Sequence, residues 1–232
     1  MSGLFYHLNR QMLVAVIPVK ELSRGKARLK PLLSAQERHL LCKTMLEDVL
    51  AVVTTSPLLD RVLVITSDAE AAVCARQYGA EIIGEVRQVR QSRSVEAAAA
   101  ICRESGAEAM LTIPLDVPRI RANDLDRIVE HGSVPRGIVL VPSRNALGTN
   151  ALLARPPEAI PFRFGYDSFQ AHRREAEAKG LPCAVCELPN LGLDIDEVDD
   201  LRCFIAQPGK TRTDRLLHRL GIGERLGIET GV

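Results

Sequence analysis

The stretch Leu111-Thr112-Ile113-Pro114-Leu115-Asp116-Val117-Pro118 decides how this chain folds. Its apolar part, residues 109–115, predicts a short buried strand. Proline stands on both sides of Asp116, where it restricts the backbone and cannot donate to a ladder. We therefore expect Asp116 at the carboxyl edge of a sheet, where open α/β sheets bind ligands. A carboxylate there can hold a magnesium ion and through it phosphates, although the same residues are compatible with a simple turn.

Strand and helix patterns alternate around this stretch. Hydrophobic periodicity and turn residues predict strands over 12–18, 61–66, 80–83 and 137–141, and helices over 34–54, 68–78, 94–105 and 123–130. Ser34 and Glu37 fit a capping box for the first helix, and Asn123 is the expected cap of the last. The alternation predicts an α/β fold with a mostly parallel, doubly wound sheet.

The chain after Pro142 has a less regular pattern. Gly148-Thr149-Asn150 is expected in a polar loop. Gly165 stands at the entry to a helix, where backbone N–H groups can face an anion. The remaining predicted elements are a helix over 168–179, a strand over 183–188, and helices over 197–204 and 209–222.

Two further carboxylates lie late in the chain, in Leu191-Gly192-Leu193-Asp194-Ile195-Asp196. Alternate residues of an extended strand point to the same face, so the side chains of Asp194 and Asp196 are expected to project together. Two carboxylates on one face repel each other unless a cation lies near them, which suits magnesium. Asp196 could instead cap the helix that follows, and the two roles can coexist.

Basic residues are concentrated in the segment 19–33, directly after the first predicted strand. They are Lys20, Arg24, Lys26, Arg28 and Lys30, with Gly25 among them. A flexible basic loop in this place could cradle phosphates. The segment matches neither a P-loop nor a Rossmann fingerprint, and a solvated charged loop is the alternative. A second basic stretch, 84–93, precedes the alanine-rich helix.

The composition argues against several classes of partner. The chain has 232 residues, with 30 Lys plus Arg against 29 Asp plus Glu, so its net charge of +1 favours neither nucleic acid nor an anionic membrane. Aromatic residues make up only 3% and Trp is absent, so platforms for stacking single strands are not expected. The chain shows neither an apolar run long enough to cross a membrane nor the layout of a signal peptide, so we expect a cytoplasmic protein.

The length suits one domain, which we expect over 12–222, between an N-terminal extension at 1–11 and a tail at 223–232. Two of the six cysteines, Cys183 and Cys186, form a C-x-x-C. The further ligands that a zinc site needs do not follow them, so structural burial is the expected role.

Seven short blocks resemble, in order, those of one enzyme family. They are Ile17-Pro18-Val19-Lys20, Gly25-Lys26-Ala27-Arg28-Leu29, Met45-Leu46-Glu47-Asp48-Val49-Leu50, Pro114-Leu115-Asp116-Val117-Pro118, Gly148-Thr149-Asn150-Ala151-Leu152, Phe164-Gly165 with Ser168-Phe169 and His172, and Leu193-Asp194-Ile195-Asp196. The family is that of the guanylyltransferases that activate a three-carbon phosphate in synthesis of a deazaflavin coenzyme, factor-420. The resemblance implies a single-domain nucleotidyltransferase fold, a three-layer sandwich with a mostly parallel mixed sheet.

The same resemblance implies an activity. GMP would pass from GTP to the phosphate of 3-phospho-D-glycerate, phosphoenolpyruvate or 2-phospho-L-lactate, with release of pyrophosphate. The family pattern makes Asp116, Asp194 and Asp196 the ligands of Mg²⁺. It assigns the nucleotide phosphates to Lys20, Lys26 and Arg28, the acceptor to Thr149, Gly165 and Ser168, and catalytic roles to Asp116 and Lys26.

The chain departs from the family pattern at one place, Ser94-Val95-Glu96, where members resemble Gly-Leu-Asn. The missing Gly and Asn would affect contacts with the nucleotide. Glu96 would add an unfavourable negative charge if it lay near phosphates. His172 is a further candidate contact for an anion, although a lone helical His is more often structural.

Three other functions remain compatible with these residues. A nucleotidyltransferase for sugar phosphates or a pterin cofactor would use a similar fold, and Asp194-x-Asp196 also resembles the metal motif of some glycosyltransferases. A nucleotide-binding regulatory protein without catalysis would explain Ser94-Val95-Glu96. The apolar helices could serve a homodimer interface or only the core.

Overall fold

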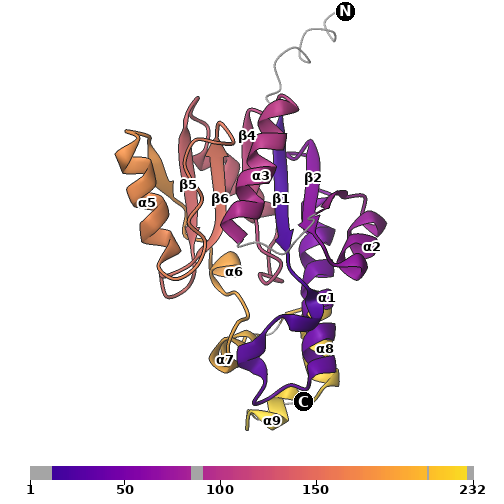
Figure 1. Ribbon diagram of the computed structural model, residues 1–232. Coiled ribbons are helices and arrows are strands. Elements are labelled where there is room, and N and C mark those ends of the chain that lie inside the picture. The colour runs from indigo at the N-terminus through magenta and orange to yellow at the C-terminus, as the bar shows by residue number, and fades with distance from the viewer. Residues whose placement is uncertain (1–11, 85–90, 208, 229–232) are drawn as a thin grey trace, which may run out of the picture.

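The sheet at the centre of the molecule has seven strands, in the order β3-β2-β1-β4-β6-β5-β7 (Figure 1). The structure is a computed structural model that describes residues 12–84, 91–207 and 209–228. The strands are β1 (Leu13–Val19), β2 (Arg61–Thr66), β3 (Glu81–Gly84), β4 (Ala109–Thr112), β5 (Gly137–Pro142), β6 (Thr149–Arg155) and β7 (Cys183–Val185). All neighbouring pairs are parallel except those made by β6, which runs antiparallel to β4 and β5.

This topology confirms the predicted single-domain α/β fold with a mostly parallel mixed sheet. The strand order reverses direction at β1, because β2 and β3 lie on one side of it and β4 on the other. The carboxyl ends of β1 and β4 therefore border the crevice in which such sheets bind ligands. The segment 20–30 follows β1, and Asp116 follows β4.

Helices cover both faces of the sheet (Figure 1). On one face α3 (Gln91–Glu104) and α5 (Ser168–Ala178) pack on a cluster that includes Val14 and Val16 of β1. Ala15 and Ile17, which alternate with them, belong to the cluster of the other face. The helices there are α1 (Ala35–Val53), α2 (Ala69–Gln77) and α4 (Ala122–His131). Because alternate residues of a strand point to opposite faces of the sheet, β1 contributes to the hydrophobic core on both faces.

The C-terminal helices lie at and beyond the carboxyl edge of the sheet (Figure 1). They are α6 (Pro189–Gly192), α7 (Val198–Ile205), α8 (Arg212–Arg219) and α9 (Ile222–Arg225), and the last three are in the lower part of Figure 1. The buried carboxylate of Asp48 in α1 accepts hydrogen bonds from the backbone N–H groups of Arg212 and Thr213, at 2.9 and 2.8 Å. Ile222 is fully buried in the core, so the packed structure extends into α9.

Several predicted boundaries are wrong by a few residues. The helix expected to be capped by Asn123 begins at Ala122 with Arg121 as its N-cap, and the one expected from Gly209 begins after Thr211, whose side chain caps it. β4 ends at Thr112, earlier than Leu115, because Pro114 cannot continue a ladder. β7 ends at 185, and α3 starts three residues before 94.

Two expectations of the sequence lie outside the described residues, the extension 1–11 and part of the second basic stretch. In the described chain no helix is long and apolar enough to cross a membrane. Cys183 and Cys186 are free thiols. Burial raises the pKa of both, which agrees with the structural role expected for them.

Candidate active site

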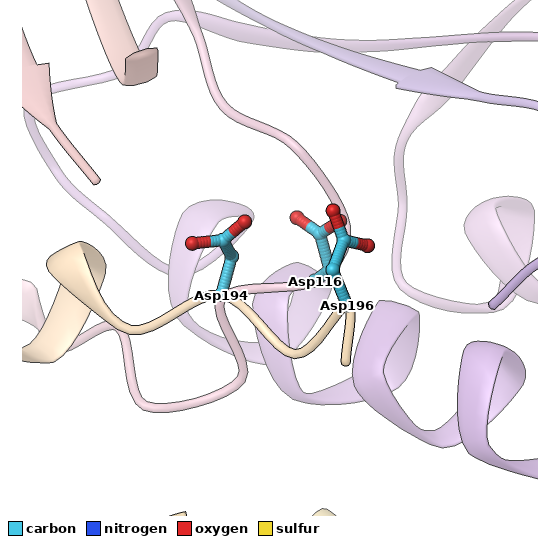
Figure 2. A group of neighbouring side chains, drawn as sticks. All are labelled: Asp116, Asp194 and Asp196. Atoms are coloured by element: carbon cyan, nitrogen blue, oxygen red, sulfur yellow. The ribbon is translucent and has the colours of Figure 1, made fainter. Parts of the chain in front are cut away.

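Three carboxylates gather at the carboxyl edge of the sheet (Figure 2). Asp116 lies in a turn four residues after β4, and Asp194 and Asp196 lie between α6 and α7. One oxygen from each carboxylate lies within 4.8 Å of the others. The backbone N–H of Ile195 donates to the carbonyl of Asp116 at 3.0 Å, which joins the two segments. The predicted cluster is therefore present.

The segment that carries Asp194 and Asp196 has no regular secondary structure, whereas the sequence predicted a strand there. Asp196 is also not a helix cap. Glu197 occupies the N-cap of α7, and the carboxylate of Asp200 accepts from the backbone N–H groups of Asp196 and Glu197, at 3.0 and 2.8 Å. The Asp196 side chain is thereby left to the carboxylate cluster.

Lys26 brings a positive charge into this cluster. Its Nζ lies 2.6 Å from Asp116 Oδ2 and 2.6 Å from Asp196 Oδ1, and the side chain is only 7% exposed. Burial alone would lower the pKa of Lys26, but the charges of Asp116 and Asp196 outweigh it and raise the pKa above its usual range. The same ion pair lowers the pKa of Asp196 against the opposing effect of burial.

The loop that carries Lys26 has a defined shape. Instead of a flexible loop, it forms two short 3-10 turns, η1 (Leu22–Arg24) and η2 (Ala27–Leu29). Gly25 lies against Cys42 of α1, so closely that a Cβ on Gly25 would lie 2.5 Å from the Sγ of Cys42. A glycine is required here because the loop packs directly on the helix.

Asp194 has surroundings unlike those of Asp196. Its Oδ1 accepts a hydrogen bond of 3.0 Å from the Nδ2 of Asn150, whose side chain is buried and also donates to the carbonyl of Leu191 at 2.7 Å. Burial and the negative charge of Asp116 raise the pKa of Asp194 to about 6. One ammonium therefore accompanies three carboxylates, and this excess of oxygen ligands and negative charge fits a divalent cation.

Two cavities meet at the carboxylate cluster, and Asp116 and Asp196 line both. The smaller cavity, of about 260 Å³, is lined by Lys20, Lys26 and Ser94 among others. The larger cavity, of about 630 Å³, is bordered by the acceptor residues named in the sequence analysis, Thr149, Gly165 and Ser168. Two different ligands could therefore reach the same group of carboxylates.

The residues of the larger cavity that the sequence predicted for the acceptor come from β6 and from the entry to α5. Thr149 and Asn150 were expected in a loop, but they are the first residues of β6 and both are buried. Their polar groups can be buried because they are hydrogen-bonded: the backbone N–H of Thr149 donates to Ser168 Oγ at 2.9 Å. Gly165 has a φ of +134°, in which only glycine is unstrained, although a Cβ would have open space around it.

Arg28 lies apart from Lys20 and Lys26, and His172 has the buried position that agrees with the structural alternative given for it. Arg28 borders the larger cavity instead of the smaller one, and its exposed guanidinium lies 2.9 Å from Glu197 Oε1. His172 is fully buried, with both ring nitrogens already engaged by protein groups. It therefore has no free nitrogen with which to contact an anion.

The three residues that depart from the family pattern, Ser94-Val95-Glu96, lie in α3. Ser94 is buried and lines the smaller cavity, whereas Glu96 is exposed on α3. Glu96 is absent from the described residues that line either of the two cavities. Its negative charge therefore does not border the cavity that Lys20 and Lys26 line.

Sequence reasoning assigned no role to several residues that line the two cavities. Gln91, at the start of α3, lines both cavities, and Asn150 and Arg144 line the larger one. Asn150 stood inside a block quoted for the resemblance, so only its hydrogen bond to Asp194 was unforeseen. Arg144, which lies 3.3 Å from Asp200, is a lone cation in a polar loop after a strand, and that position was its only signal.

Comparison with known proteins gives a consistent result. The profile of the family described as "Guanylyl transferase CofC like" matches residues 13–227. A phosphoenolpyruvate guanylyltransferase from Roseiflexus castenholzii is 39% identical over 204 residues, which cover 88% of this chain and 93% of the relative. A 3-phospho-D-glycerate guanylyltransferase from Colwellia psychrerythraea is 35% identical, covering 80% and 88%. A 2-phospho-L-lactate guanylyltransferase from Methanothermobacter thermautotrophicus is 34% identical, covering 89% and 90%.

A solved structure supports the fold independently of close sequence similarity. A nucleotidyl transferase from Methanothermobacter thermautotrophicus superposes with a TM-score of 0.62 at 17% identity, covering 90% of this chain and 99% of the other. At such an identity the likeness concerns the fold alone. Because the family profile spans nearly all of the described residues, the chain is a member of the CofC-like guanylyl transferase family.

Proposed function

We propose that this protein transfers GMP from GTP to the phosphate of a three-carbon acid and releases pyrophosphate. The observation that carries the proposal is the meeting of two cavities at Asp116 and Asp196. The acceptor is one of 3-phospho-D-glycerate, phosphoenolpyruvate and 2-phospho-L-lactate, the acids named for the three relatives. We further propose, from the resemblance of the sequence blocks, that the product serves synthesis of the deazaflavin coenzyme.

In this proposal the smaller cavity receives the phosphates of GTP and the larger one the acid. Lys20 and Lys26 line the first, where their ammonium groups would offset the charge of the triphosphate. Thr149, Gly165 and Ser168 line the second. Arg28 stands at the larger cavity and would meet the carboxylate or the phosphate of the acid instead of the nucleotide.

The reaction requires the protein to position the two substrates more than to take part covalently. An oxygen of the acceptor's phosphate attacks the α-phosphorus of GTP and forms a new P–O bond, while the bond from the α-phosphorus to the bridging oxygen breaks. The electron pair of that bond leaves with pyrophosphate. A phosphate is already ionised near neutral pH, so no side chain needs to act as general base.

Asp116, Asp194 and Asp196 would hold Mg²⁺ in this site. The fit rests on their oxygens within 4.8 Å of one another and on the single ammonium that accompanies three carboxylates. When bound, the ion supplies a Lewis acid that offsets charge on the reacting phosphates. Lys26 stands beside the same carboxylates, where its positive charge would stabilise the transition state and the departing pyrophosphate.

Three expectations about the protein as a whole stay predictions. They are the magnesium requirement, the cytoplasmic location and a homodimer. The regulatory alternative rests on the departure at Ser94-Val95-Glu96, and binding of GTP without turnover would distinguish it. Ser94 keeps its interest for nucleotide choice, since it lines the smaller cavity.

Pyrophosphate release tests the proposed function. GTP and ATP are each offered with each of the three acids in the presence of Mg²⁺. We expect release with GTP and at least one acid, and none when either substrate is omitted. Folded protein that binds GTP but releases no pyrophosphate with any pair of substrates would overturn the proposal and would favour the regulatory function.

A further inference from the structure

His172 is a buried residue of α5 whose two ring nitrogens have different partners. It is 0% exposed, lies four positions after Ser168 in the helix, and packs edge-on against Phe164 with ring centroids 4.9 Å apart. Its Nε2 lies 2.8 Å from the backbone nitrogen of Arg163. Its Nδ1 lies 3.0 Å from Thr149 Oγ1.

These contacts fix the tautomer of the ring. A backbone N–H can only donate, so Nε2 must be the unprotonated nitrogen that accepts from Arg163. Burial lowers the pKa of His172 to about 4, so the ring is neutral at working pH. The one proton of the neutral ring is then on Nδ1, the nitrogen that faces Thr149.

The tautomer in turn restricts the hydroxyl group of Thr149. Because Nδ1 carries a proton, Thr149 Oγ1 can only accept at this contact, and its own proton must point elsewhere. Ser168 Oγ accepts from the backbone N–H of Thr149 at 2.9 Å. Its own hydroxyl donates to Thr149 Oγ1 at 3.4 Å, at the long limit of a hydrogen bond, so Thr149 Oγ1 accepts at this contact as well.

We propose that His172 is a positioning residue that makes the Thr149 hydroxyl a hydrogen-bond donor toward the larger cavity, where the weakly held Ser168 hydroxyl can turn to a ligand as a second donor. Both residues line that cavity, while His172 lies behind them. A pair of donors suits an ionised oxygen, which accepts hydrogen bonds but cannot donate one. The site would therefore select a fully ionised phosphate or carboxylate over a neutral or esterified analogue. This inference rests on the proposed function, because it concerns the acceptor of that reaction.

Two substitutions separate positioning from simple packing. In His172→Asn the amide nitrogen can take the place of Nδ1 and still donate to Thr149. In His172→Gln the amide oxygen can take the place of Nε2 and still accept from Arg163. Glu177→Gln, an exposed change on the same helix, is the matched control.

The Michaelis constants of acceptor and GTP are measured for each variant by pyrophosphate release. We expect His172→Gln to raise that of the acceptor about tenfold or more and to leave that of GTP unchanged, since a factor of ten corresponds to about 1.4 kcal/mol. His172→Asn loses the contact with Arg163 but should raise the Michaelis constant of the acceptor by less than about threefold. The control, Glu177→Gln, should change neither the constant of the acceptor nor that of GTP. Equal effects of Asn and Gln, or constants that rise together for both substrates, would overturn the proposal.

A spectroscopic measurement on the unchanged protein covers the cases in which a variant does not fold or the wild type shows no turnover. The nitrogen chemical shifts of the His172 ring, measured by NMR after ¹⁵N labelling, report which nitrogen is protonated. We expect a neutral ring with the proton on Nδ1. A proton on Nε2, or a charged ring at neutral pH, would overturn the proposal. Absence of turnover in the wild type would count against the proposed function alone.

Discussion

The two cavities that meet at Asp116 and Asp196 are built from different kinds of interaction. The smaller one depends on charge: Lys26 bridges carboxylates that lie 90 and 170 positions away in the sequence. One wall of the larger one depends on neutral hydrogen bonds of Thr149 with Ser168 and His172, which lie 19 and 23 positions after it. Under the proposed function, the charged cluster would carry the chemistry and the neutral network would recognise the acceptor.

Removing a carboxylate should have the largest effect. Asp116→Asn is expected to lower kcat by about 10³-fold or more, because the shared cluster loses a ligand and a charge. The backbone carbonyl that accepts from Ile195 remains, so the fold should survive. Pyrophosphate release measures the loss, and circular dichroism checks the fold. Activity close to that of the wild type would refute the role of the cluster.

Removing the ammonium should have the next largest effect. Lys26→Met is expected to lower kcat by about 10²-fold or more, because a preorganised positive charge is lost beside the reacting phosphates. The same change should tighten the binding of Mn²⁺, used as a probe in titration calorimetry, since a cation at 2.6 Å from Asp116 and Asp196 no longer competes for them. Weaker Mn²⁺ binding would show that Lys26 supports the ion site instead of competing with it.

The neutral side should respond in binding more than in turnover. Ser168→Ala is expected to raise the Michaelis constant of the acceptor about tenfold while that of GTP changes little, because one donor to the acceptor is lost. Alanine also leaves the buried backbone N–H of Thr149 without the acceptor that Ser168 Oγ provides at 2.9 Å, so circular dichroism and the unchanged constant for GTP serve as controls for the fold. An acceptor constant equal to that of the wild type would remove Ser168 from the acceptor site.

A separate prediction concerns stability and pH instead of activity. The pKa of His172 in the folded protein is lowered to about 4, below the value near 6.5 of an unfolded chain. Between these two values the unfolded chain binds the proton and the folded one does not, so stability is present above about pH 6.5 and is lost as the pH falls toward 4.

This loss is expected to reach about 2–3 kcal/mol. Urea unfolding of the wild type and of His172→Gln at several pH values would measure it. The stability of the variant should fall less steeply between pH 6.5 and 4. Parallel curves would mean that His172 titrates normally in the folded protein.

The fold could be predicted from the sequence to a large extent. The observed bounds of β2 and α1 agree with those predicted from periodicity and turn residues, and the capping box predicted at Ser34 is present. These features depend on local sequence patterns. β6 was missed because it opens with Thr149 and Asn150, which look like loop residues. Their burial depends on partners in α5 and near α6 that no local pattern reveals.

The candidate site, like the fold, could be predicted from the sequence only in part. Asp116, Asp194 and Asp196 were expected together from strand ends and the family blocks, and they do lie together. The contact of Lys26 with two of them depends on distant segments and on the packing of Gly25 against Cys42. Sequence spacing carries no information about such contacts. The buried position of His172 was equally out of reach, because a helical histidine alone does not reveal its partners.

The most direct test of the account is to follow the α-phosphate of the nucleotide. The protein is incubated with Mg²⁺, GTP labelled with ³²P at the α-phosphate, and each three-carbon acid in turn. The account predicts a labelled product that contains both GMP and the acid, with unlabelled pyrophosphate released in equal amount. Label that remains in GTP or appears only in free GMP, from folded protein saturated with both substrates, would contradict transfer between the two cavities.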